Sequence, residues 1–241
     1  MDATIKASTP ERAEIRWSAI IFRPYLTIAV PVLLALLTIR LVMTPAFLAF
    51  EYRRPGFPDD IYGFTLAERL EYAPYTVDYL LNGEDITYLS DLRFPTGESM
   101  YTTRELRHMR DVKAVTQIAF LLASIMGITV SIIGYHLWRD SGKRRVLRRG
   151  LLDGSLLTLS IIATIIMVAI INWDQFFTAF HQVFFESGTW RFSYSDTLIR
   201  LFPEQFWFDA ALTIGTLTSI GAGIILLITW RWNLTPGSAD N

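Results

Sequence analysis

The side chains best suited to chemistry in this sequence belong to two histidines, His108 and His181. Histidine has an unperturbed pKa of about 6.5, so a pair that comes together can accept one proton and return another near neutral pH. Asp111 follows His108 by three residues, which predicts that it shares a helix face with the ring and can orient it. The third histidine, His136, lies close to Trp138 and is interpreted as a residue of the membrane interface.

Arg40 is a further candidate because it lies within an apolar stretch, near the outer end of that stretch. A charge in the hydrocarbon core costs about 2.5 kcal/mol or more unless it reaches the interface or finds a partner. Two interpretations stay open. Arg40 forms an ion pair that locks the helices together, or it binds an anionic or carbonyl group of a lipid substrate. The acidic residues at the same boundary are Glu204, Asp209 and Asp174.

Several reaction classes lose support from what the sequence lacks. The chain has no cysteine, which removes thiol nucleophiles and thiolate metal sites. It also has no G-x-S-x-G, H-E-x-x-H, P-loop or dinucleotide motif. The basic residues that cluster do so where topology explains them, so nucleic acid is not an expected partner. We expect no metal and no cofactor, although a metal site made by His108, Asp111 and His181 stays open as an alternative.

Four apolar windows must position these residues, and each is long enough to cross a hydrocarbon core about 30 Å thick as a helix. The connection between the second and third windows is short and basic, which predicts that it stays in the cytoplasm together with both chain ends. The expected fold is an all-α membrane protein with four transmembrane helices, N-in and C-in, without a cleaved signal peptide. The windows run from Tyr25 to Phe50, Ala114 to Trp138, Leu151 to Trp173 and Trp207 to Trp232. The basic residues of the connection are Arg139, Lys143, Arg144, Arg145, Arg148 and Arg149.

This topology divides the chain into a cytoplasmic segment of residues 1–24, a membrane domain of residues 25–235 and a cytoplasmic tail of residues 236–241. Two outer loops, about 51–113 and 174–206, carry short helices that are expected to cap the bundle. His108 and His181 each lie towards one end of such a loop. We therefore expect the four-helix bundle to bring the two rings together on the outer face.

Local signals predict the elements of the outer loops. Thr65 and Glu68 form a capping box for a helix over 66–72, and Pro74 predicts a separate helical piece over 75–81. Residues 85–94 are compatible with a strand. Thr102 and Glu105 form a second capping box, which starts a helix that is predicted to continue into the second span.

Two further patterns concern the segments that follow. An aromatic helix lying in the interface is predicted around His181, and a short helix is predicted from Ser195 and Asp196 to near Phe202. Small residues in the second and fourth spans predict close helix contacts. The residues of the aromatic helix are Phe176, Phe177, Phe180, Val183 and Phe184, and the small residues are Ser124, Gly127, Ser131, Gly134, Gly215, Ser219 and Gly223.

Four short motifs stand out in these elements: His108-Met109-Arg110-Asp111-Val112; Phe180-His181-Gln182-Val183-Phe184-Phe185 with Trp190 downstream; Asp196-Thr197-Leu198-Ile199; and Phe202-Pro203-Glu204. They resemble the motifs of the lipoprotein intramolecular transacylase family. Tyr79 and Leu80 are similar to part of the first outer loop of that family. The resemblance includes the four-span plan and covers nearly everything from the first span onward.

The resemblance implies a multi-pass acyltransferase of the bacterial cytoplasmic membrane whose active face is outward. Such an enzyme moves the sn-2 acyl chain of a diacylated lipoprotein to the α-amine of the same N-terminal cysteine. It also implies that His108 and His181 are the catalytic pair. We expect His108, oriented by Asp111, to be the base and His181 the acid. The residues expected to orient the pair or bind substrate are Asp111, Arg40, Trp190, Glu204 and Tyr79.

Two alternatives from other classes stay open. The chain could be a non-catalytic membrane scaffold that binds a lipid or a partner protein, with histidines that sense pH or pack. It could also be a metal-dependent lipid hydrolase. Alanine at His108 and His181 separates the leading hypothesis from the first alternative, because a binding module keeps its partner and an acid–base pair fails.

Overall fold

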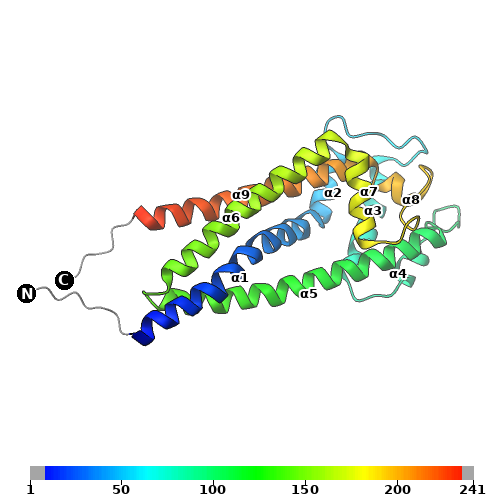
Figure 1. Ribbon diagram of the computed structural model, residues 1–241. Coiled ribbons are helices and arrows are strands. Elements are labelled where there is room, and N and C mark those ends of the chain that lie inside the picture. The colour runs from blue at the N-terminus through cyan, green and yellow to red at the C-terminus, as the bar shows by residue number, and fades with distance from the viewer. Residues whose placement is uncertain (1–8, 235–241) are drawn as a thin grey trace, which may run out of the picture. The chain divides into compact units, whose positions relative to one another are not determined.

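The structure is a computed structural model that describes residues 9–234 and the side chains of residues 12–232. Within that range all regular secondary structure is helical, apart from an isolated bridge between Arg93 and Ser99. Four of the helices are long and apolar enough to cross a membrane (Figure 1). They are α1 (Thr9–Val42), α5 (Thr103–Arg139), α6 (Arg144–Ile171) and α9 (Glu204–Leu234). The all-α class and the four spanning helices are therefore confirmed.

The chain divides into two compact units, and each long helix contributes to both. Unit 1 contains the described residues up to Ala35, the stretch Ala123–Thr164 and the described residues from Leu217. Unit 2 contains Leu36–Leu122 and Ile165–Thr216. All the candidate site residues belong to unit 2.

In unit 1, helices α1 and α6 approach closely at two glycines. A Cβ atom on Gly150 would lie 2.9 Å from Leu26 Cβ, and one on Gly154 would lie 2.7 Å from Val30 Cβ. Only a residue without a side chain fits at these positions. Next to this contact, Arg23 Nε donates to Asp153 Oδ2 over 2.6 Å.

The small residues predicted to make such contacts behave differently. A Cβ on Gly127 would meet Leu33 at an ordinary 3.9 Å, and Gly134 and Gly223 have no neighbouring atom within 4 Å in the described chain. The prediction of close contact at these three glycines was wrong. The pair Gly150 and Gly154 was overlooked because it straddles the start of the third apolar window.

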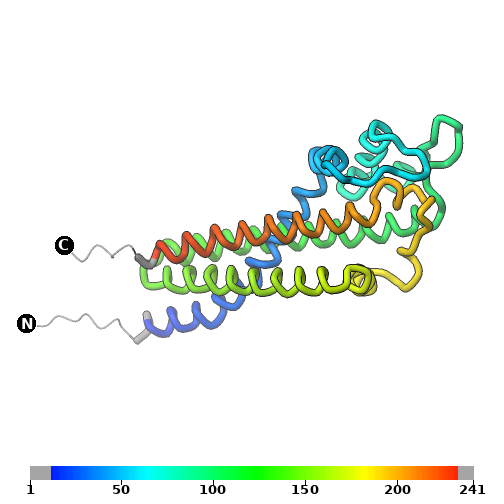
Figure 2. The backbone as a smooth tube through the Cα atoms, turned by 90° about the horizontal axis from the view of Figure 1, so that it is seen from above, coloured from blue at the N-terminus to red at the C-terminus, as the bar shows by residue number. Residues whose placement is uncertain are grey.

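Unit 2 combines the remaining parts of the long helices with five short helices. These are α2 (Pro45–Tyr52), α3 (Leu66–Leu81), α4 (Thr87–Ser90), α7 (Trp173–Phe184) and α8 (Thr197–Leu201). Figures 1 and 2 show α2, α3, α4 and α8 gathered beside the first turns of α5 and α9. Their shared core includes Leu48, Ala73, Leu89 and Leu201, each of which is almost completely buried.

The first long helix begins and ends earlier than the predicted span of Tyr25 to Phe50. Helix α1 ends at Val42, and Pro45 begins the separate helix α2 instead of continuing to Phe50. Proline suits the first turn of a helix, and the Thr44 side chain caps α2 by accepting from the Phe47 N–H. A proline and its capping residue therefore outweigh the apolar composition of the window.

Two predictions for the first loop were also wrong. Helix α3 runs unbroken through Pro74, because buried residues on both sides of the proline pack into the core of unit 2. The region 85–94 is not a strand but contains the short helix α4, which follows a turn where Asp85 accepts from the Thr87 N–H over 2.8 Å. Asp side chains favour turns of this kind over strands.

Several local predictions are confirmed. Both capping boxes are present: Thr65 with Glu68 before α3, and Thr102 with Glu105 before α5. Helix α5 continues from that cap through its apolar region without a break. Helices α7 and α8 occupy the predicted places, and Asp196 is the N-cap residue of α8.

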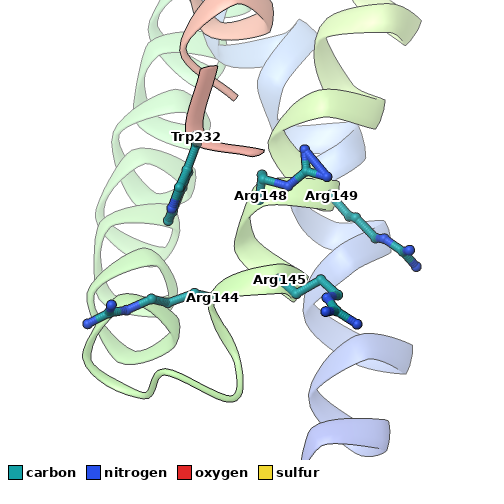
Figure 3. A pocket seen from close by; sticks show the side chains of 5 residues that line it. All are labelled: Arg144, Arg145, Arg148, Arg149 and Trp232. Carbon is teal, nitrogen blue, oxygen red and sulfur yellow. The ribbon is translucent and has the colours of Figure 1, made fainter. Parts of the chain in front are cut away.

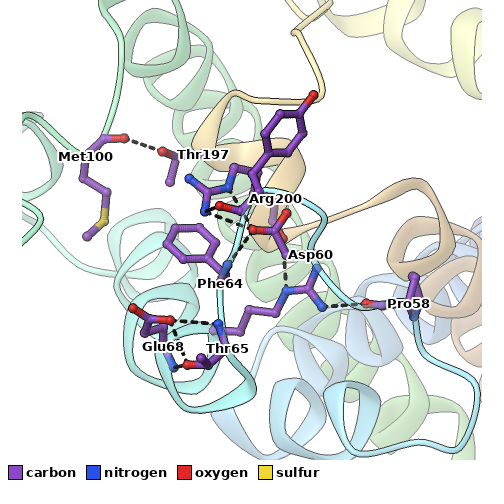
Figure 4. A network of polar contacts seen from close by, with 10 residues as sticks. Pro58, Asp60, Phe64, Thr65, Glu68, Met100, Thr197 and Arg200 are labelled. Carbon is purple, nitrogen blue, oxygen red and sulfur yellow. Dashed lines mark hydrogen bonds and ion pairs between the residues drawn. The ribbon is translucent and has the colours of Figure 1, made fainter.

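Two arginines, the buried Arg69 and the partly buried Arg200, hold the loop of residues 53–65 against α3 and α8 (Figure 4). Arg200 pairs with Asp60 at 3.0 Å, and its guanidinium lies 3.7 Å from the centroid of the Phe64 ring. Arg69 donates to the carbonyl groups of Pro58 and Arg200. The same figure shows Thr197 donating to the Met100 carbonyl, which ties the start of α8 to the segment before α5.

Candidate functional site

His108 and His181 come together in unit 2. His108 projects from the second turn of α5, and His181 lies in the last turn of α7. Their ring centroids are 6.4 Å apart and the rings are inclined by 26°. His108 is only 9% exposed, whereas His181 is partly exposed. The convergence expected from the sequence is thus present, at a separation that lets both rings contact one small reacting group.

Aromatic side chains surround both rings. Phe185 and Phe192 lie 5.0 Å and 5.4 Å from His108, measured between ring centroids. Phe177 and Trp190 lie 4.1 Å and 4.6 Å from His181. We call these four residues the aromatic box. Apolar walls exclude water and strengthen any electrostatic interaction made inside them.

A backbone carbonyl fixes the orientation of the His181 ring. Its Nδ1 lies 2.8 Å from the Phe177 carbonyl oxygen, one helical turn earlier. Because a carbonyl can only accept, Nδ1 carries the proton and donates it. In the neutral ring Nε2 is then the free acceptor. Burial lowers the pKa of His181, and the bond to Phe177 opposes that shift in part.

Two polar atoms of the site have no hydrogen-bond partner within residues 12–232. They are Nδ1 of His108 and Nε1 of Trp190, and both are buried. Trp190 itself is 8% exposed. Most buried polar atoms in proteins are paired, and an unpaired one costs about 1–3 kcal/mol. The site therefore holds unsatisfied hydrogen-bonding capacity next to His181.

The segment that carries Phe185, Trp190 and Phe192 is anchored to the start of α5. Arg104 pairs with Asp196 at 2.8 Å, and its guanidinium lies 5.3 Å from the centre of the Phe192 ring. Glu105 is completely buried. It accepts from the Leu198 N–H over 2.7 Å in addition to closing its own capping box. These contacts lie one turn before His108, so the same turn of α5 positions the histidine and the segment that covers it.

Asp111 does not orient His108. It is exposed, and Nδ1 of His108 is buried and unpartnered in the described structure. Spacing by three residues places two side chains on neighbouring parts of a helix surface, but here one lies inwards and the other reaches solvent. The prediction of an Asp111–His108 pair was wrong.

Arg40 also differs from its prediction. It lies in the last turn of α1, not well inside a span, and Nη1 donates to the Met43 carbonyl over 3.2 Å. An ion pair of Arg40 with Glu204, Asp209 or Asp174, which was one of its two interpretations, is absent from the described side chains. Asp209 instead pairs with Arg54, which also contacts the buried Glu51. Desolvation by burial raises the pKa of Glu51, and Arg54 opposes this shift.

The other predicted residues fall in different places. Trp190 is part of the aromatic box. Tyr79 is buried in the core of unit 2, where it stacks on Tyr88 and lies under the ammonium group of Lys113. Glu204 is exposed in the first turn of α9. The structure thus brings Trp190 to the histidines, whereas Tyr79 makes other contacts and Glu204 lies on the surface.

No group of three or more potential metal ligands from His, Asp and Glu forms among the described residues. In particular, the exposed position of Asp111 separates it from the ligand set that was considered with His108 and His181. Two histidines alone are an incomplete set for a tetrahedral zinc site with three protein ligands. The geometry favours proton transfer over metal binding at this pair.

A family model described as lipoprotein intramolecular transacylase Lit matches residues 25–207. The chain belongs to this family. The chain is also similar to an uncharacterized protein from Aquifex aeolicus (strain VF5), with 31% identity over 210 residues. The alignment covers 87% of this chain and 90% of the Aquifex protein.

Solved structures from the Lit family share the fold. The membrane integral lipoprotein intramolecular transacylase Lit from Bacillus cereus aligns with a TM-score of 0.68 and 20% identity, over 92% of this chain and 96% of the other. A variant of the Bacillus cereus protein with one histidine replaced by alanine gives a TM-score of 0.67 at 19% identity, over 91% and 93% of the two chains. The family named from the sequence motifs is confirmed, and so is its membrane fold.

Sequence reasoning missed most of the aromatic box. Phe177 was assigned only to an interfacial helix, and Phe192 was not singled out. The four-residue spacing from Phe177 to His181 predicts that the two lie on one helix face, which was the available signal. Phe192 had no comparable signal, because its position depends on how Asp196 and Arg104 fix the loop.

Proposed function

We propose that this member of the Lit family is a lipoprotein intramolecular transacylase. It moves the sn-2 acyl chain of a diacylated lipoprotein to the α-amine of its N-terminal cysteine, at the outer leaflet of a bacterial cytoplasmic membrane. The observation that carries the proposal is the pair of histidine rings, enclosed by aromatic residues, in a chain of this family. The substrate supplies both nucleophile and ester, so the protein needs no nucleophile of its own.

His181 is the proton carrier in this proposal. The Phe177 carbonyl holds Nδ1 as a donor, which leaves Nε2 to accept a proton from the attacking amine. The amine nitrogen then bonds to the ester carbonyl carbon, the bond from that carbon to the glyceryl oxygen breaks, and His181 returns the proton to this oxygen. One ring can serve both steps because, in the tetrahedral intermediate, the amine nitrogen and the leaving oxygen are attached to the same carbon. This assignment differs from the prediction, in which His108, oriented by Asp111, was the base and His181 was the acid.

His108 positions the reacting groups. No ion pair joins either histidine to a carboxylate within residues 12–232, so neither ring has a partner that favours a resident imidazolium. The unpartnered Nδ1 of His108 is instead available for a hydrogen bond to the amine or the leaving oxygen. Its low exposure and its contacts with Phe185 and Phe192 hold the ring in place.

Trp190 stabilises the developing negative charge on the ester oxygen. Its Nε1–H is buried, unpartnered and attached to a ring 4.6 Å from His181. A donor that is fixed before reaction stabilises an oxyanion without reorganisation. Arg40, the candidate suggested by the sequence, is exposed at the end of α1, where it already donates to a backbone carbonyl.

Helix α7 offers a route for acyl chains. Phe180, Val183 and Phe184 are 50%, 75% and 47% exposed, and their spacing forms one apolar stripe. The Phe180 ring also lies 5.6 Å from His181. An apolar stripe on an amphipathic helix inserts at the boundary between head groups and acyl chains, which is where a lipoprotein holds its ester.

The test is expression in a host whose lipoproteins are diacylated with free α-amines, followed by mass spectrometry of the N-terminal lipopeptides. We expect lyso-form peptides with an N-acyl chain from the unaltered protein. We expect a loss of about a hundredfold or more with His108→Ala or His181→Ala. His136→Ala is the matched control, because this third histidine packs against Phe22 in unit 1.

Unchanged lipopeptides in the presence of membrane-inserted protein would refute the proposal. Equal activity of the two site variants and the His136 control would remove the histidine mechanism even if the product forms. Retention of a lipoprotein by all variants without any product would instead identify a binding protein.

A further inference from the structure

Unit 1 contains a cavity lined by four arginines. Arg144, Arg145, Arg148 and Arg149 occupy the first two turns of α6, and Trp232 of α9 completes a cavity of about 300 Å³. Figure 3 shows the arginine side chains leaving successive turns of α6 with the Trp232 ring on the side of α9. This group is separate from the histidine site, which lies in unit 2.

Within residues 12–232, the four arginines form no ion pair with a carboxylate. In unit 1, within residues 12–232, ten Lys and Arg residues accompany only three carboxylates, those of Glu14, Asp140 and Asp153. Asp153 pairs with Arg23, and Glu14 and Asp140 both pair with Lys143. No described carboxylate of the unit is therefore left to neutralise the four arginines of the cavity.

The arrangement places like charges together at an unfavourable position. Arg144 and Arg148, and likewise Arg145 and Arg149, are separated by four residues, a spacing at which like charges on a helix repel. The first turns of a helix also favour anions over cations. An external anion in the cavity relieves both effects.

Two of the four guanidinium groups are already oriented by the protein. Arg148 Nη1 donates to the Thr229 carbonyl over 3.2 Å, and Arg144 Nε donates to the Trp138 carbonyl over 2.8 Å. A guanidinium has five N–H donors, so each keeps further donors for a ligand. Fixing a side chain in advance reduces the entropy lost when a ligand binds.

We infer that this cavity binds the phosphodiester head group of an anionic phospholipid. The arginines supply the planar donors that suit phosphate oxygens. Trp138 and Trp232 pack at 5.0 Å between ring centroids beside them, and paired indoles are typical of the depth at which head groups lie. Basic pockets between spanning helices bind such lipids. The inference does not depend on the acyl transfer proposed for unit 2.

The experiment reconstitutes the full chain in nanodiscs of zwitterionic phosphatidylcholine and titrates in phosphatidylglycerol, with retained lipid counted by native mass spectrometry. We expect saturable retention of phosphatidylglycerol over phosphatidylcholine. Each Arg→Gln change at Arg148 or Arg149 should weaken it about fivefold. Arg231→Gln is the matched control, because Arg231 belongs to the same unit and is exposed outside the cavity lining.

Equal retention by Arg148→Gln and Arg231→Gln would overturn the inference, since it would show unspecific attraction to a basic unit. Displacement of phosphatidylglycerol by millimolar inorganic phosphate would identify a site for free phosphate instead of lipid. Because the chain has no cysteine, a single cysteine placed in the basic connection reports its side of the membrane by thiol labelling. A variant that keeps its labelling pattern but loses retention separates lipid binding from altered topology.

Discussion

At the residue scale, the proposed chemistry depends on two ring nitrogens that have no hydrogen-bond partner within residues 12–232. Nδ1 of His108 and Nε1 of Trp190 are buried within the aromatic region around His181. A buried polar atom without a partner destabilises a folded protein by about 1–3 kcal/mol. A substrate that supplies the missing partner recovers this free energy on binding. In the proposed reaction, these two ring nitrogens form hydrogen bonds with oxygen or nitrogen atoms of the substrate.

Trp190→Phe removes one of these donors and keeps an aromatic ring. If Nε1–H stabilises the oxyanion, the rate at saturating lipopeptide should fall about a hundredfold with little change in apparent KM. The measurement is the rate of lyso-form product in detergent or nanodiscs. Trp207→Phe is the control, because Trp207 contacts Phe202 and Phe206 and not the histidines. A change in KM alone would assign Trp190 to packing.

The protonation of His181 gives a second prediction. Burial lowers its pKa, so we expect the ring to titrate below the value of about 6.5 for an exposed histidine. As the pH falls below 6.5, the unfolded chain binds the proton first. The contribution of His181 to stability is therefore complete above pH 6.5 and is lost as the pH falls through the folded-state pKa.

NMR of protein with carbon-13-labelled histidine measures this directly, because the chain has only three histidines. Spectra of His108→Gln and His136→Gln variants assign the signal of His181. A midpoint at or above 6.5 would contradict the prediction and would favour a resident imidazolium over a proton acceptor.

The two histidines were predictable as a pair because few other side chains in this chain can exchange protons near neutral pH. The groups that orient the two rings could not be predicted. Asp111 has the right spacing to orient His108 but is exposed to solvent. The observed partner of His181 is a backbone carbonyl, a group that every residue possesses. A backbone acceptor leaves no trace in residue types, so sequence alone could not identify it.

At the scale of elements, Glu105 joins two helices at one point. Its carboxylate accepts from Thr102 at the start of α5 and from the Leu198 N–H at the start of α8. The capping box with Thr102 was predicted from the sequence, but the bond to α8 depends on tertiary contact. One residue consequently fixes both the turn that carries His108 and the end of the segment that carries Trp190.

Glu105→Gln replaces a charged acceptor of the same size by an amide whose NH₂ group opposes the N–H donors. We expect a loss of about 2 kcal/mol in stability, the usual effect of losing hydrogen bonds to a buried charge. Hydrogen exchange at the Leu198 amide should accelerate more than exchange elsewhere. Glu68→Gln is the control, since it alters the equivalent box of α3 on an exposed surface, where a smaller loss is expected. Similar losses in both variants would contradict a role for the contact with α8.

Capping residues and apolar spacing predicted the helix boundaries better than the positions of prolines or the apolar composition did. The boxes at Thr65 and Thr102 correctly marked two helix starts. Pro74 was overvalued as a break, because the packing of α3 into the core compensates for one missing hydrogen bond. Pro45 was undervalued, because the apolar residues after it continue the hydropathy of the first span.

At the scale of the whole molecule, close approach of α1 and α6 organises unit 1. Gly150 and Gly154 leave no room for a Cβ against Leu26 and Val30. Between spanning helices there is no hydrophobic driving force of the kind that operates in water, so close packing carries more of the stability. Arg23 and Asp153 add an ion pair at the same contact.

Gly154→Ala should force the two helices apart and lower stability by about 1–3 kcal/mol, the usual effect of overpacking. Gly134→Ala is the control, because no described atom lies within 4 Å of the new methyl group and alanine is the better helix former. Thermal unfolding in detergent, followed by tryptophan fluorescence, compares the two. A stable Gly154→Ala variant would show that the helices can separate without loss.

The number and class of the long helices followed from apolar length alone, which is why the four spans could be predicted. The division into two units could not, because each long helix contributes to both and nothing in its composition marks the change. The expected orientation, with both ends in the cytoplasm, remains a prediction from the basic connection.

The exposed stripe of α7 has a consequence for selectivity. Phe180, Val183 and Phe184 do not distinguish the acyl chains of a lipoprotein from those of ordinary phospholipids, which greatly outnumber them in a bilayer. We therefore expect bulk lipid to occupy the site for most of the time as an unreactive competitor. The esters of phosphatidylglycerol and phosphatidylcholine have no primary amine tethered beside them, so occupancy by these lipids does not lead to reaction. Discrimination between lipoprotein and bulk lipid would then depend on the intrinsic reactivity of the bound molecule and not on its affinity for the site. Turnover would slow as bulk lipid is added at a constant amount of lipoprotein.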